Sequence, residues 1–322
     1  SQVTPVGQVC NLSHALVSMD RLETCPTEKL IACLSHPNAW WRQTAQRLLI
    51  QRNDPSAVGP LESLARDGKT PQARLHAFYT LDGLDALTPH IVEHAIADPH
   101  YAVRLHALRL CESWLDEQRS LLEEALKGVD DPDARVRLQL AMTLGETQDE
   151  RALSALARLA ARDGADEWMR AAILSSVVDS ADRLLSTIVQ PTDEPGESRR
   201  LLQPLAAVVG ARHRDDEIAN LLKTVIEIDD GDPTTIQRTC LNGLIEGLQR
   251  GRAQPFTSTD GQRALRGLLT TSSADVRLLA LRVAGLVKLA ESPEMNTAFA
   301  SAASEALDDD RPLEARRAAI AL

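Results

Sequence analysis

DPHYAVRLHALRL (98–110) and DPDARVRLQLAMTL (131–144) are two copies of one phrase, and this phrase decides the fold. Each copy has an acidic turn with Pro, an Arg, and apolar residues three or four positions apart. Apolar residues with this spacing line one face of an α-helix. With the Arg as a marker, looser copies extend over most of the chain, at Arg42, Arg74, Arg104, Arg137, Arg170, Arg200, Arg238, Arg277 and Arg316. The sequence therefore predicts an internal repeat.

The markers are 30 to 39 residues apart, which is enough chain for two helices and two turns. A second amphipathic segment lies between markers, as in DEQRSLLEEALKG (116–128). We expect each repeat to be helix A, a turn, and helix B with the Arg. The Asp-Pro pairs at 98–99, 131–132 and 232–233 should begin helix B, because Asp caps N–H groups and Pro fits the first turn. The prediction is an all-α solenoid of about nine helical hairpins, each leaning on its neighbours.

The repeat length predicts a division of the chain into three parts. Residues 1–26 are irregular, 27–189 should hold five hairpins, and 190–322 should hold four with longer loops. The longer period comes with stretches rich in Pro, Gly, Ser and Thr at 190–198 and 250–261, as loops are. The chain has no initial Met and stops inside a helical pattern, so we expect a fragment of a larger protein.

Composition and motifs argue against several functions. The formal net charge of −11 disfavours a nucleic-acid partner, because phosphates demand a basic face. No apolar run reaches the ~18 residues that span a membrane. The sequence contains no G-x-S-x-G, P-loop, H-E-x-x-H or C-x-x-C pattern, so we expect no catalytic residue, metal or cofactor. A disulfide between Cys10 and Cys25 stays open.

The Asp-to-Arg phrase resembles the HEAT repeat family in its short bacterial form. In that family the turn acid and the helix-B Arg form a hydrogen-bonded ladder along the stack. The resemblance implies a structural ladder built from Arg42, Arg74, Arg104, Arg137, Asp98 and Asp131. Where His36, Gly68, Gly164 or Thr271 replaces the acid, the ladder should be broken or use another residue.

HPNAWWRQTAQRLLIQRND (36–54) and ARLHAFYTLDGLDAL (73–87) carry a narrower resemblance. They look like the HEAT region of planctomycete and verrucomicrobial membrane-bound dehydrogenase or haem-binding proteins. There, a sorbosone-dehydrogenase-like β-propeller precedes the repeats and a C-x-x-C-H cytochrome c domain follows them. The resemblance implies a connector between such domains and an exported, periplasmic location. Neither the propeller nor C-x-x-C-H is in this sequence.

Aromatic and His residues are candidates for a protein-binding surface: Trp40, Trp41, Tyr79, His76, His106 and Trp114. Aromatic residues dominate interface hot spots, but core packing is the competing interpretation. Trp40 and Trp41 point about 100° apart on a helix, so at least one should be buried. His76 and His106 hold equivalent places in adjacent repeats and could be near neighbours, although a metal site needs further ligands.

The favoured function is a non-catalytic protein-binding or interdomain scaffold. Its partner would be another protein or a neighbouring domain of the same chain, met on a long concave surface. The alternative is a HEAT-like enzyme or a chromophore- or metal-handling protein of the lyase type. Its site would lie on helix B around Trp41, His76 and His106. A third possibility, nucleic-acid binding, predicts an affinity that falls steeply with salt.

Overall fold

The computed structural model describes residues 24–190, 196–228, 232–251, 256–271, 273–308, 310 and 313–320. Every regular element in these ranges is an α-helix or a short 3-10 helix, so the predicted all-α fold is confirmed. Contacts divide the chain into two compact units, Ser1–Cys111 and Glu112–Leu322, called unit 1 and unit 2 below. No helix of the described ranges is long and apolar enough to cross a membrane.

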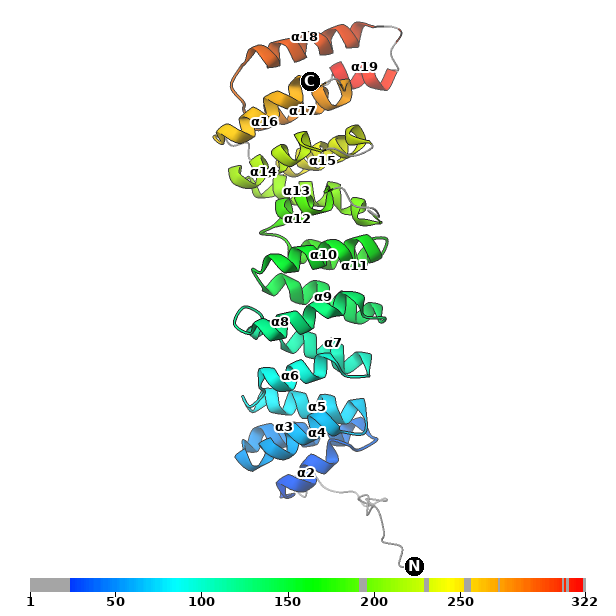
Figure 1. Ribbon diagram of the computed structural model, residues 1–322, viewed down its shortest axis with the longest axis vertical. Helices are drawn as coiled ribbons and strands as arrows, with labels where there is room; N and C mark the ends of the chain where they lie inside the picture. Colours follow the sequence, from blue (N-terminus) through cyan, green and yellow to red (C-terminus); the bar gives the residue numbers. More distant parts are fainter. Residues whose placement is uncertain are drawn as a thin grey trace, which may run out of the picture. The chain divides into compact units, whose positions relative to one another are not determined.

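Unit 1 contains hairpins 1 to 3, stacked in chain order (Figure 1). The A helices are α2 (Thr27–Cys33), α4 (Val58–Asp67) and α6 (Pro89–Ile96). The B helices are α3 (Ala39–Arg52), α5 (Pro71–Gly83) and α7 (Tyr101–Leu110), and η1 (Pro55–Ala57) precedes α4. Successive B helices pack on each other, as do α4 and α6. Leu30, Leu49, Leu61 and Leu81 are fully buried between these layers.

Unit 2 contains hairpins 4 to 9, also stacked in chain order (Figure 1). Its A helices are α8 (Arg119–Leu126), α10 (Glu150–Asp163), α12 (Ala181–Ile188), α14 (Asp215–Ile226), α16 (Thr259–Leu269) and α18 (Pro293–Leu307). Its B helices are α9 (Ala134–Thr143), α11 (Glu167–Ser176), α13 (Leu202–Arg212), α15 (Pro233–Leu248), α17 (Ala274–Leu286) and α19 (Leu313–Ile320). Short 3-10 helices lie in the connections: η2 (Glu112–Trp114), η3 (Lys127–Asp130), η4 (Leu144–Glu146) and η5 (Ser198–Leu201). The predicted alternation of helix A and helix B is therefore present in both units.

The turn before helix B differs from the prediction in two repeats. Asp232 caps α15 and Pro233 begins it, as expected. The pairs at 98–99 and 131–132 do not begin their helices, which start three residues after the Asp. Each of these Asp side chains instead accepts a hydrogen bond at 2.8 Å from the backbone N–H two residues later. The Asp-Pro pair thus shapes the turn, and a later residue caps the helix.

The two compact units are defined by contacts between residues, whereas the boundary expected at residue 190 comes from a change in repeat length. The division into 1–26, 27–189 and 190–322 therefore stays a prediction. Cys10 lies outside the described residues, and so does its possible disulfide with Cys25.

Candidate protein-binding surfaces

The marker Arg clamps the turn that precedes its own helix. Its guanidinium donates a hydrogen bond of 2.7 to 2.9 Å to the backbone carbonyl six residues earlier. The pairs are Arg42 with His36, Arg74 with Gly68, Arg104 with Asp98, Arg137 with Asp131, Arg170 with Gly164 and Arg277 with Thr271. Every residue offers a carbonyl, so this bond does not depend on an acidic side chain at that position.

The acidic side chain pairs with the Arg of the preceding repeat. In unit 1, Arg74 donates from Nε and Nη2 to the Asp98 carboxylate at 2.6 and 2.8 Å, and both residues are buried. In unit 2, Arg137 makes the same two bonds to Asp163, both at 2.7 Å. These bonds raise the pKa of Arg137. Each of these arginines joins its own turn to the next hairpin and has little donor capacity left for a ligand.

Two repeats show what happens where Gly replaces the turn acid. Asp163 stands one residue before Gly164, and its carboxylate takes the Arg of the previous repeat. Asp67 stands one residue before Gly68 but is exposed. The Nε atom of Arg42 in the preceding hairpin is buried without a hydrogen-bond partner. Asp163 therefore replaces the turn acid beside Gly164, whereas no acid does so beside Gly68, and the Nε donor of Arg42 stays unsatisfied.

All four tryptophans of the chain lie at least partly at the surface. Trp40 is 47% exposed and Trp168 is 70% exposed, while Trp41 and Trp114 are half-buried. The expectation that Trp40 or Trp41 is buried is therefore wrong. Their rings pack edge to face with centroids 5.1 Å apart, and Trp41 also lies 5.6 Å from the ring of His36. The indoles cover each other and stay outside the core.

Trp168 is not among the residues predicted from the sequence, although its position gives a signal. It stands two residues before Arg170, as Trp40 stands two residues before Arg42. This position is the second residue of helix B, where the N-cap side chain accepts a hydrogen bond from the Trp backbone N–H at 2.9 Å in α3 and 2.7 Å in α11. The repeat register thus places an exposed indole at the start of helix B in each unit.

His76 and His106 each bond to a different side chain of the preceding hairpin. Nδ1 of His76 lies 2.7 Å from Oε1 of Gln46, and Nδ1 of His106 lies 2.7 Å from the hydroxyl of Tyr79. Burial lowers the pKa of both imidazoles, and a nearby Arg adds to the effect. Within the described ranges, no group of three or more His, Cys, Asp or Glu side chains could hold a metal ion. These bonds join adjacent B helices, and the role of the two His residues in binding stays a prediction.

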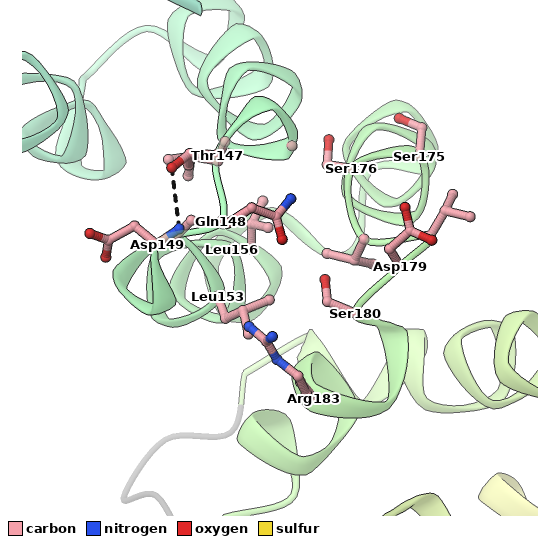
Figure 2. Close-up of a pocket in the computed structure, with 15 residues that line it drawn as sticks. Thr147, Gln148, Asp149, Leu153, Leu156, Ser175, Ser176, Asp179, Ser180 and Arg183 are labelled. Carbon is pink, nitrogen blue, oxygen red and sulfur yellow. Dashed lines mark hydrogen bonds between the residues drawn. The ribbon is translucent and has the colours of Figure 1, made fainter. Parts of the chain in front are cut away.

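A cavity of about 110 Å³ opens in unit 2 where the connections after α9 and α11 meet (Figure 2). Buried apolar side chains form its floor: Leu144, Leu153, Leu156 and Val177. More exposed polar side chains form its rim: Gln148, Ser175, Asp179 and Ser180. The cavity is therefore amphipathic, and the sequence did not predict it because its two walls lie about one repeat apart.

Residues 88–177 match the family model described as HEAT repeats, which agrees with the Arg clamps seen there. This stretch is similar to HEAT repeats. It is less than a third of the chain, and the comparison with curated proteins found no match.

Solved structures with a similar fold include an engineered protein and two named proteins, Kap121p and Kap95p. The engineered protein is 14% identical, with 91% of this chain and 86% of that chain covered and a TM-score of 0.35. Kap121p is 11% identical, with 91% and 36% covered and a TM-score of 0.47. Kap95p, whose binding induces the switch loops of RanGDP to adopt the GTP-bound conformation, is 12% identical, with 94% and 57% covered and a TM-score of 0.34. This chain thus spans 36% of Kap121p and 57% of Kap95p, and the likeness concerns the fold alone.

Proposed function

We propose that the chain is a non-catalytic scaffold that binds a protein partner or a neighbouring domain of its own polypeptide. The observation that supports this most is the surface position of all four tryptophans, in a chain whose core is mainly Leu, Ala and Val. Trp is enriched at interface hot spots because it brings a large, rigid contact area. An exposed Trp on a capped helix start is also preorganised, which reduces the entropy lost on binding.

The alternative enzymatic or metal-handling function finds no supporting observation among the described residues. Nδ1 of His76 is bonded to Gln46 and Nδ1 of His106 to Tyr79. The scaffold therefore remains the function that the geometry supports best.

The test is quantitative capture of partners by chemical cross-linking and mass spectrometry. The double variant Trp40→Ala, Trp168→Ala should lose partners by tenfold or more, since hot-spot truncations cost at least about 2 kcal/mol. Gln72→Ala is the matched control, because Gln72 is exposed and also stands two residues before its marker Arg. Equal capture by the wild type and the Trp variant would contradict the proposal.

Two finer proposals rest on the resemblance of residues 36–54 and 73–87. The first is that the chain connects a dehydrogenase domain to a cytochrome c domain in a larger bacterial protein, and the second is that this protein is exported to the periplasm. Sequencing the complete gene tests both. A propeller-coding region upstream, a C-x-x-C-H motif downstream and a secretory leader would support them, whereas unrelated flanking sequence would contradict the connector.

A further inference from the structure

We infer that one edge of unit 2 binds a basic protein segment, and that the cavity of Figure 2 takes the side chain of one Lys or Arg of that segment. The inference rests on the proposed function in one respect, namely that the partner is a protein. It goes further by naming the chemistry of the partner and a surface other than the tryptophans.

The edge consists of three successive connections, each taken from the end of helix B into the start of the next helix A: 112–118, 144–150 and 177–182. They contain eight Asp and Glu residues and no Lys or Arg. The first two are joined by a hydrogen bond of 2.6 Å from Thr147 Oγ1 to Asp116, and the last two line the cavity together.

Arginines border this edge but do not neutralise it. Each of the three connections is followed by one Arg in the first turn of the next helix, at Arg119, Arg151 and Arg183. Asp182 is buried and accepts a hydrogen bond from Asn220, and Arg212 pairs with Asp179, so three acidic residues remain in excess at the surface when all four arginines are counted. A surface with this charge attracts a basic segment and repels an acidic one.

The cavity has the two-part chemistry of a Lys or Arg side chain, which buries an apolar stem and keeps its charged end in a polar environment. Leu153, Leu156 and Val177 would contact the stem, while Gln148 and Asp179 at the rim would receive the charged end. α11 ends at the cavity, and helix C-termini carry partial negative charge. Its volume, about 110 Å³, is below the roughly 150 Å³ of a cavity that holds benzene, so one extended side chain suits it.

Two arginines already lie near the cavity, and both have other partners. Arg183 pairs with Glu150 at 2.9 Å. Arg212 pairs with Asp179 at 2.6 Å and also with Glu217 at 3.0 Å. The Asp179 side chain is 80% exposed, and ion pairs this exposed are weak, so an incoming cation can share its carboxylate.

Exposed apolar side chains next to the cavity supply further contact area. Val178, which lines the cavity, is 44% exposed, and Met142 at the end of α9 is 42% exposed. The hydroxyl of Ser176 donates to the carbonyl of Ala141 at 2.8 Å, which holds the ends of α9 and α11 together. The bound segment should therefore carry an apolar residue beside its Lys or Arg.

The first experiment uses a fluorescein-labelled peptide with four Gly-Val-Lys repeats, in which Val supplies the apolar residue beside each Lys, and measures fluorescence anisotropy at low salt. One control peptide replaces each Lys by norleucine, which removes the charge, and another uses 2,3-diaminopropionic acid, which keeps the charge but shortens the stem. The Lys peptide should bind at least fivefold more tightly than either control. Equal binding of the short-stem peptide, or no binding of the Lys peptide, would overturn the inference.

The second experiment compares protein variants with the Lys peptide. Asp179→Lys should weaken binding tenfold or more, and Ser175→Trp should weaken it by obstructing the mouth of the cavity. Glu167→Lys is the matched control, because it makes the same charge change at an exposed residue at the start of α11. Circular dichroism checks that each variant is folded. Equal losses for Asp179→Lys and Glu167→Lys would show general attraction to an acidic protein and would overturn the inference.

The two proposals fail separately. The double variant Trp40→Ala, Trp168→Ala should bind the Lys peptide as the wild type does. If this variant loses captured partners but still binds the Lys peptide, the result bears on the tryptophan surface only. If the wild-type protein does not bind the Lys peptide, only the cavity proposal is contradicted.

Discussion

Unit 2 joins its hairpins in two different ways. Between hairpins 4 and 5, Arg137 bonds to the carbonyl of Asp131 and to the carboxylate of Asp163. In hairpins 6 and 7 the marker arginines are exposed: Arg200 pairs with Glu197, and Arg238 pairs with Asp275 at 3.2 Å.

Hairpins 6 and 7 instead approach through small residues on α13 and α15. A Cβ atom on Gly243 would lie 2.2 Å from the carbonyl oxygen of Gln203, and one on Gly247 would lie 2.2 Å from that of Ala207. The backbones of the two helices are therefore in direct contact. A repeat junction can be stabilised by a polar clamp or by close helix packing, and this chain uses both.

The largest expected effect is the loss of the polar clamp. Arg137→Ala removes the bonds to two hairpins and leaves the carboxylate of Asp163 partly buried without its partner. Breaking a buried pair in this way costs about 3–5 kcal/mol. Arg238→Ala is the matched control, since its exposed ion pair should contribute less than about 1 kcal/mol. Urea unfolding measures both, and similar losses would refute the distinction between the two junctions.

The next effect concerns the glycine contact. Gly247→Ala places a methyl group against the backbone of α13, and overpacking of this kind costs about 1–3 kcal/mol. The matched change is Gly285→Ala, where nothing lies within 4 Å of the new Cβ atom. It should stabilise α17 by up to about 1 kcal/mol, because Ala is the better helix former. Stabilisation by both substitutions would show that α13 and α15 are not in close contact in solution.

The order of helices can be predicted from the sequence because the apolar pattern that sets it is local. Leu121, Leu122 and Ala125, for example, lie on the apolar face expected between 116 and 128, and all three are buried. The marker Arg is equally visible, since it recurs with the repeat. Its main hydrogen-bond acceptor, however, is a backbone carbonyl. Because every residue has one, a pattern of side chains cannot predict this bond.

Other features depend on contacts between segments about one repeat or more apart. Whether Trp41 or Trp168 is covered depends on the neighbouring hairpin, which helical periodicity does not describe. The exposed position of Arg238 has the same origin: Gln237, one residue earlier, is buried and donates to the carbonyl of Val225 at 3.0 Å. A shift of one residue on a helix turns a side chain by about 100°, enough to move it from the junction to the surface.

A smaller, pH-dependent effect is expected at the start of α10, the end of the helix opposite Asp163. Asp149 caps α10, and hydrogen bonds from Arg151 lower the pKa of its carboxyl from 3.8 to about 2. Its stabilising contribution is therefore complete above the unfolded pKa near 3.8 and is lost as the pH falls through about 2. Asp149→Ala should cost about 1 kcal/mol at pH 7, the usual value of an N-cap, and progressively less below pH 4. Urea unfolding of both proteins at several pH values measures the difference, and a constant cost down to pH 2 would contradict this assignment.

The smallest expected effect is a change in the labelling rate of Cys240, which depends on the close contact between α13 and α15. Cys240 is fully buried in α15, and burial raises its pKa to about 12. Only the thiolate reacts with disulfide reagents, so Cys240 should resist labelling in the folded protein at pH 8. Gly247→Ala forces α13 and α15 apart and should speed this labelling, whereas Gly285→Ala should not. Peptide mass spectrometry after timed labelling identifies the modified cysteine. If Cys240 reacts equally fast in both variants, exposure of the thiol is governed by opening of the whole unit and not by the contact between the two helices.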